Sequence, residues 1–252
     1  MFKLLRRLLK DENVVGISLI RNKVYVKSPA VVPREYGEVE VIGEPRPFFR
    51  YPFGCSPDFR VGGNGFLTAQ HCVGINKDQG TVKMNDDTYA KIVESNPWRP
   101  FTRFTLIECF IEYLLTGKTV SCLNKDWAII DGGNEFTGRP IGALSGGTEP
   151  PGISFFAPYV PNPEEWINKE ICGISYDYDN KKYVLGTWKI DDLGVVKYDI
   201  EDKVYFVYVW YARGFSKPGF SGTNAFPAGT CPRLPEVKKL EALDYIVMAD
   251  KA

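Results

Sequence analysis

The longest uninterrupted run of aliphatic and aromatic residues in this chain has nine residues, from Val204 to Ala212. A run of this length suits a strand, whereas a helix needs about 20 apolar residues to cross a bilayer. The run therefore predicts a buried strand and argues against an integral membrane segment. Gly, Pro, Asn and Asp separate further short apolar or alternating runs along the chain. This pattern is typical of an all-β protein.

The length and the charge balance limit the architecture and the partners. A chain of 252 residues with 44% hydrophobic content suits one large β-domain or two packed β-barrels. The 31 Lys and Arg residues balance the 31 Asp and Glu residues, so no overall field favours nucleic acid or an anionic membrane. We therefore expect no nucleic-acid partner. The oligomeric state stays open.

Proline-rich stretches at 45–52 and 148–163 are interpreted as linkers. They divide the chain into 1–45, with a short amphipathic helix and a small N-terminal β-unit, then 46–147 and 148–252. The helix at 1–10 suits packing on the protein or contact with a membrane surface, and 234–242 also has helical periodicity. Strands are expected at 13–20, 23–28, 37–44, 63–69, 80–84, 89–95, 105–115, 126–131, 182–190, 193–200, 203–212 and 243–250, and only 105–115 fits a helix equally well.

His71 is the one histidine of the chain, at the end of the strand-like run GNGFLTAQHC (63–72). A serine hydroxyl becomes a nucleophile at neutral pH only when a base takes its proton, and histidine, with a pKa near ~6.5, is suited to that task. The apolar run stops at His71 and is followed by Cys-Val-Gly, as at a strand end that opens onto a surface. His71 is therefore the candidate general base.

Asp126 is the candidate carboxylate for orienting that base. It begins the short strand-like run DWAIID (126–131), 55 residues after His71. Three other carboxylates compete with it. Asp86 and Asp87 lie in a turn-like MNDDT, and Asp131 begins a DGG turn.

Ser221 is the candidate nucleophile. It lies in GFSG (219–222), where glycine permits a tight turn whose backbone N–H groups converge on an oxyanion. Ser145, in GALSGG, competes with it. Ser145 follows Asp126 too closely for most of a second barrel to intervene, and it lacks a glycine two positions earlier.

The segment LTAQHC (67–72) resembles the L-T-A-A-H-C segment of chymotrypsin-like (trypsin-like) serine proteases, and GFSG resembles their G-x-S-G core. The chain order His, Asp, Ser is also that of this family. The resemblance implies two six-stranded-type antiparallel β-barrels and a serine endopeptidase that acts on polypeptides without a cofactor. His71, Asp126 and Ser221 would form the catalytic triad, and the N–H groups of Gly219 and Ser221 the oxyanion hole.

The six cysteines lack a C-x-x-C spacing, so no metal site is expected. The resemblance implies a disulfide between Cys55 and Cys72. The other expected pairs are Cys172 with Cys231 and Cys109 with Cys122, among about 15 connectivities for six cysteines. Disulfides favour an oxidising compartment or the interior of a hyperthermophile, and no secretory signal peptide is evident. The location is therefore expected to be intracellular, or extracellular by a route without a signal peptide.

The chain departs from the family at two aromatic positions. Phe220 stands where the family usually has an Asp that, in zymogen-activated members, pairs with a freed N-terminal amine. Phe215 stands six residues before Ser221, where a carboxylate would select basic substrates. Neither that activation route nor a trypsin-like preference is expected, and the short segment after Ser221 implies an incomplete or different specificity pocket. Two alternatives stay open, namely an inactive protease-fold binding or assembly module and a structural β-sandwich with a chance triad.

Overall fold

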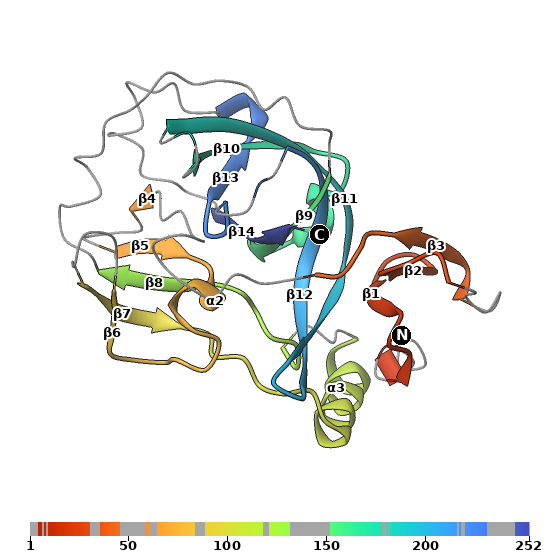
Figure 1. Cartoon of the computed structure of the whole chain (residues 1–252). Coiled ribbons are helices and arrows are strands. Elements are labelled where there is room, and N and C mark those ends of the chain that lie inside the picture. The colour runs from red at the N-terminus through yellow and green to blue at the C-terminus, as the bar shows by residue number, and fades with distance from the viewer. Residues whose placement is uncertain are drawn as a thin grey trace.

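The structure is a computed structural model that describes residues 5–6, 8, 10–30, 36–45, 59–60, 65–83, 89–117, 121–131, 152–177, 180, 182–215, 217, 220–230 and 245–251. It is mostly β, with few helices (Figure 1). The strands are β1 (Val14–Ser18), β2 (Lys23–Val26), β3 (Glu38–Val41), β4 (Phe59–Arg60), β5 (Gly65–Thr68), β6 (Thr81–Lys83), β7 (Tyr89–Ser95), β8 (Ala128–Asp131), β9 (Gly152–Tyr159), β10 (Glu170–Asp177), β11 (Lys182–Ile200), β12 (Lys203–Gly214), β13 (Asn224–Pro227) and β14 (Tyr245–Lys251). The helices with described bounds are α2 (Gln70–Val73) and α3 (Arg103–Thr116), with 3-10 turns η4 (Pro163–Trp166) and η5 (Ala228–Thr230). The described residues Leu5, Arg6, Leu8 and Lys10 are also helical, in agreement with the helix expected at 1–10.

The larger sheet has nine strands in the order β10-β13-β14-β9-β12-β11-β1-β2-β3. Strand β10 also pairs with β11, so the strands from β10 to β11 form a closed ring of antiparallel pairs. The strands β1, β2 and β3 continue the same sheet beyond the ring. The expected small N-terminal β-unit is thus an extension of this sheet.

Strand β12 shows what stabilises the larger sheet. Successive side chains of a strand point to opposite faces. Phe206 and Trp210 belong to one buried apolar cluster, whereas Tyr205 and Val207 belong to another. Because both faces are buried, the run from Val204 to Ala212 needs no polar side to face water.

The smaller sheet has five strands in the order β4-β5-β8-β7-β6, all antiparallel (Figure 1). Its buried side chains, such as Phe66, Ala90 and Ile130, form a separate apolar cluster. Ala157 of β9 also belongs to this cluster. A strand of the larger sheet therefore contributes directly to the core of the smaller one.

The segment 105–115, which fitted a strand or a helix, is part of α3. The helix begins after Thr102, whose hydroxyl accepts a hydrogen bond from the backbone N–H of Thr105. It ends at Gly117, whose φ of 70° is left-handed and favours glycine. A side-chain cap at one end and a glycine at the other thus favour a helix over a strand for this segment.

The interpretation of 148–163 as a linker was wrong in its central part, because β9 lies within it, hydrogen-bonded between β12 and β14. Both Phe155 and Phe156 are fully buried. The two strands expected at 182–190 and 193–200 are a single strand, β11, with an irregularity between Ile190 and Asp192. Strands β10 and β13 were not expected at all.

At the N-terminus, the side chains of Leu5 and Leu8 are fully buried in the main apolar cluster. These two leucines support packing on the protein in place of contact with a membrane surface. The helix expected at 234–242 lies outside the described ranges. Within the part of the chain that is described, no helix is long and apolar enough to cross a membrane.

Candidate active site

His71 lies on the one-turn helix α2, directly after strand β5 of the smaller sheet. Its Nδ1 atom is 2.7 Å from Oδ2 of Asp126, and its backbone N–H donates to Oδ1 of the same carboxylate at 2.9 Å. The exposed fractions of His71 and Asp126 are 0% and 1%. Both carboxylate oxygens thus hold one residue. The other ring nitrogen, Nε2, lies 3.8 Å from Sγ of Cys72, and an imidazole oriented at Nδ1 exchanges protons with a nucleophile through Nε2.

Gln70, next to His71, is a buried amide that the sequence analysis missed. Its Nε2 donates to the carbonyl oxygens of Gly74 at 2.9 Å and Lys77 at 2.8 Å, and its Oε1 accepts from the backbone N–H of Asn96 at 2.8 Å. These bonds join the residue before His71 to the turn after it and to the residue that follows β7. A glutamine within the apolar run GNGFLTAQHC is the signal that could have revealed it.

Two asparagines hold the segment that carries Asp126. The Oδ1 atom of Asn96 accepts from the backbone N–H of Lys125 at 3.3 Å. Asn124 binds both backbone groups of Arg99, accepting from its N–H at 2.7 Å and donating to its carbonyl at 2.9 Å. Asn96 thereby connects the turn of the histidine to the residue before the aspartate.

Ser221 lies in the turn that leads into β13, and 5% of it is exposed. The N–H of Thr223 donates to the carbonyl of Phe220 at 3.0 Å, which closes the turn around the serine. Gly222 has a φ of 85°, so glycine is favoured directly after the serine. Gly219, the other expected oxyanion donor, lies outside the described residues.

The turn of Ser221 is tied to the strand that leads to His71. Asn224 donates through Nδ2 to the carbonyl of Leu67 in β5 at 2.9 Å and to that of Gly222 at 3.2 Å. Leu67 lies on the smaller sheet, whereas Asn224 begins β13 of the larger one. One buried side chain therefore links the segments of the two candidate catalytic residues.

A partly buried ion pair also holds the segment before Ser221. Lys217 Nζ donates to Asp177 Oδ1 at 2.8 Å, and Asn180 donates to the same carboxylate through its backbone N–H and its Nδ2. Burial alone would raise the pKa of Asp177. The hydrogen bonds from Lys217 and Asn180 outweigh that effect and lower the pKa to about 2.

Phe220 and Phe215 occupy an apolar environment. Phe220 is 1% exposed and belongs to the main cluster, and its ring meets that of Phe215 edge to face, with centroids 5.5 Å apart. An acidic side chain at position 220 would enter this cluster. The aromatic residue at 220 is thus matched to its surroundings.

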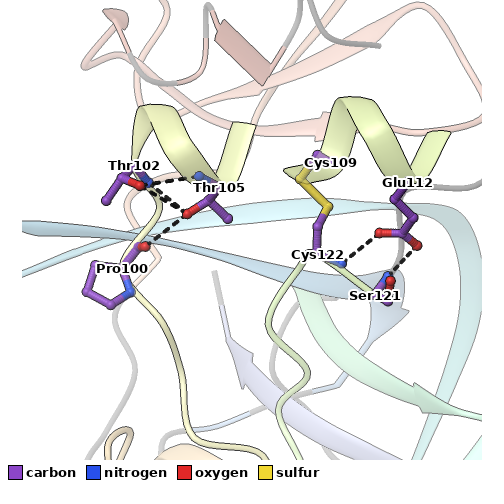
Figure 2. The surroundings of a disulfide bond; sticks show 7 residues. All are labelled: Pro100, Thr102, Thr105, Cys109, Glu112, Ser121 and Cys122. Carbon is purple, nitrogen blue, oxygen red and sulfur yellow. Dashed lines mark hydrogen bonds between the residues drawn. A yellow bond between two sulfur atoms is a disulfide. The ribbon is translucent and has the colours of Figure 1, made fainter. Parts of the chain in front are cut away.

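The disulfide predicted between Cys109 and Cys122 is confirmed, and it joins α3 to the segment before Asp126 (Figure 2). Cys72 and Cys172 are also disulfide-bonded. The pairs predicted for them, with Cys55 and Cys231, fall outside the described residues.

The competing candidates Ser145, Asp86 and Asp87 likewise lie in segments that the structure does not describe. Asp131 ends strand β8, and Asp126 is the carboxylate in contact with His71. Across the described ranges, no group of three or more His, Cys, Asp or Glu side chains could hold a metal ion.

Comparisons with known proteins give one family and distant structural likenesses. The family described as "Putative filamentous viruses peptidase" matches residues 31–228. No curated protein matches the chain. The Rv3671c protease in an inactive form is 13% identical, with a TM-score of 0.32 over 76% of each chain. Rv3671c from M. tuberculosis H37Rv, as an inactive serine-to-alanine mutant, is 12% identical, with a TM-score of 0.32 over 76% of this chain and 74% of that one. At these TM-scores the likeness is distant.

Proposed function

Because the chain belongs to the Putative filamentous viruses peptidase family, we propose that it is a serine endopeptidase that hydrolyses polypeptides through an acyl-enzyme. The contact of 2.7 Å between His71 and Asp126 carries this proposal. A buried histidine oriented by a carboxylate is the arrangement that activates a serine hydroxyl. The family match supports peptide-bond hydrolysis, and the histidine–aspartate pair supports the serine class.

In the proposed mechanism, Ser221 Oγ attacks the carbonyl carbon of the scissile bond. His71 Nε2 takes the hydroxyl proton and gives it to the leaving amine, while Asp126 stabilises the imidazolium. The N–H groups of Gly219 and Ser221 donate to the oxyanion of the tetrahedral intermediate. Water, deprotonated by His71, then attacks the acyl-enzyme and releases the carboxylic acid product together with the regenerated serine.

We further propose that the closed ring from β10 to β11 is the second of two chymotrypsin-like barrels, and that the five-stranded sheet belongs to the first. The proposed domains are 1–45, 46–147 and 148–252. The antiparallel pairing of the ring supports this arrangement. Strand β14 also supports it, because the short segment after Ser221 still supplies a strand that pairs with both β13 and β9.

The alternative function is an inactive protease-fold module for binding or assembly. The observation in its favour is low accessibility, because only 5% of Ser221 and none of His71 is exposed. A substrate needs access to both side chains. This alternative keeps the same residues but assigns them no chemistry.

Cleavage of an unfolded protein substrate between pH 6 and 9 tests the proposed function. Wild-type protein should cleave it. The His71→Ala and Asp126→Asn variants should lose roughly 10⁴-fold or more in kcat, because base and orienting carboxylate act as a unit. Asp131→Asn is the matched control, since it changes a carboxylate at the other end of the same segment. Folded wild-type protein that cleaves nothing would favour the inactive module.

A further inference from the structure

Helix α3 presents a wide apolar face to solvent. The exposed fractions of its outward side chains are 79% for Phe104, 55% for Ile107, 50% for Ile111, 65% for Leu114 and 80% for Leu115. Figure 1 shows the helix at one end of the molecule, and the segment just before it is hydrogen-bonded to the start of β12, from the N–H of Phe101 to the carbonyl of Val204. A contiguous apolar face of this kind on a water-exposed helix marks an interaction surface.

The opposite side of α3 is fastened to the protein, so the apolar face has a fixed direction. Cys109 forms a disulfide with Cys122, and the two carboxylate oxygens of Glu112 accept from the backbone N–H groups of Ser121 and Cys122, each at 3.0 Å (Figure 2). Leu106 packs against the main apolar cluster. The helix is therefore already formed and oriented before any partner arrives.

The spacing of the outward residues is that of a coiled-coil seam. Phe104, Ile107, Ile111 and Leu114 follow one another at intervals of three, four and three residues. These are the a, d, a and d positions of a heptad repeat, which pack against a second helix. In this register Cys109 occupies position f, opposite the seam, in agreement with its attachment to the protein body.

The charged residues beside the seam identify the second helix. Arg103 occupies a g position and Glu108 the e position five residues later. In a parallel helix pair, g of one helix lies beside e of the following heptad of the other, and such pairs select partner and orientation. Two identical copies of α3 would thus form two Arg103–Glu108 pairs. In the part of the chain that is described, neither residue makes an ion pair within its own copy.

We propose that α3 is a dimerisation helix that pairs in parallel with α3 of a second copy, around a two-fold axis along the seam. A two-fold interface must be complementary to itself, and the residues at g and e meet that condition. A lipid surface is a poorer fit. Helices that bind anionic lipid carry an excess of basic residues, whereas Arg103 and Glu108 balance one another.

Sedimentation velocity over a concentration series tests the proposal with charge exchange. Arg103→Glu and Glu108→Arg should each weaken the dimer about tenfold, because each replaces two attractive pairs by two repulsive ones. The double variant, Arg103→Glu with Glu108→Arg, should restore wild-type affinity. Ile111→Glu should weaken the dimer about a hundredfold or more, because it places charge in the seam.

Val93→Glu is the matched control, since Val93 is an equally exposed apolar residue (60%) on β7, and it should leave the dimer unchanged. The Ile111→Cys variant should form a disulfide between copies, because an a position faces itself only in a parallel, in-register pair. Circular dichroism and mapping of the Cys109–Cys122 bond verify that α3 remains folded.

A wild-type protein that stays monomeric at every concentration overturns the proposal. So does a dimer that the double charge exchange fails to restore. A monomer that sediments with vesicles of phosphatidylcholine and phosphatidylglycerol would assign the apolar face to lipid instead.

Discussion

Amide side chains that bind backbone groups flank His71 and Asp126, whereas the turn of Ser221 combines the buried amide of Asn224 with aromatic packing of Phe220, the residue before the serine. On the first side, the side chains of Gln70 and Asn96 bind backbone groups around the pair. On the second side, Phe220 is buried in the main apolar cluster. Hydrogen bonds are directional and hold a side chain in one orientation, whereas packing of an aromatic ring fills space and stabilises the fold. Substitution of the amides beside His71 should therefore mainly reduce activity, and substitution of Phe220 should mainly reduce stability.

The largest expected effect comes from Phe220→Asp. This change removes a buried aromatic ring and places a carboxylate in an apolar cluster, and the two costs together amount to about 4 kcal/mol or more. We expect most of the protein to be unfolded at 37 °C, as measured by urea denaturation followed by circular dichroism.

The control for this variant is Phe220→Leu, which keeps an apolar side chain and should cost about 1.5 kcal/mol or less. If Phe220→Asp were as stable as Phe220→Leu, a cationic partner for position 220 would have to exist. The claim that aromatic packing of Phe220 stabilises the turn of Ser221 would then be wrong.

A smaller effect, on activity, is expected for Gln70→Ala. Loss of this side chain removes its hydrogen bonds to the carbonyl of Lys77 and the N–H of Asn96, while the carbonyl of Gly74 keeps only the N–H of Lys77. The His71 ring is then less well positioned. We expect kcat to fall roughly 10- to 100-fold with little change in KM, because ring orientation matters most in the transition state.

Gln70→Glu tests the two donated bonds. It keeps the acceptor for Asn96 but turns a buried carboxylate oxygen toward the carbonyls of Gly74 and Lys77, so its kcat and its stability should fall at least as far as those of Gln70→Ala. Equal falls in stability and activity, with kcat normal in the folded fraction, would show that Gln70 has a structural role only.

The smallest effect, and one that depends on pH, is expected for Asp177→Asn. The pKa of Asp177 is about 2 in the folded protein, below the ordinary value of 3.8. The ionised carboxylate therefore contributes about 2 kcal/mol of stability above pH 4, and this contribution is lost as the pH falls through 2.

Urea denaturation at pH 6, 4 and 2 should accordingly show a stability difference between wild type and Asp177→Asn that shrinks toward zero at the lowest pH. Asp199→Asn is the control, because Asp199 is 62% exposed and its nearest cation, Lys197, is 3.9 Å away. A difference that does not change with pH would exclude the Lys217 ion pair as its cause.

Much of the fold could be predicted from the periodicity of the sequence, with failures of clear origin. The run from Val204 to Ala212 predicted β12 because both faces of that strand are buried. Strand β9 was missed because Pro151 and Pro158 flank and interrupt it, although Pro158 is tolerated in the pairing with β14. Helix α3 was ambiguous because apolar residues lie on its core side, as Leu106 and Cys109 do, as well as on its exposed side, so the sequence shows a nearly continuous apolar run that periodicity alone does not assign.

In the candidate site, the residues with a chemical signature were the ones that the sequence made evident. His71 and Asp126 were chosen from motif and chain order, and they lie in contact. Gln70 and Asn96 were missed, because their partners are mostly backbone groups brought close only by the folded chain. A sequence motif records reactive side chains but not the carbonyls and amides that position them.

Activity-based labelling with a fluorophosphonate tests the central claim most directly. An activated serine reacts with this probe, whereas an ordinary hydroxyl lacks a positioned proton acceptor and does not. Peptide mapping should find the label on Ser221, Ser221→Ala should abolish labelling, and His71→Ala should slow it by about 10³-fold or more. Label on Ser145, or none on folded wild-type protein with its disulfides intact, would contradict the assignment of Ser221 as the nucleophile.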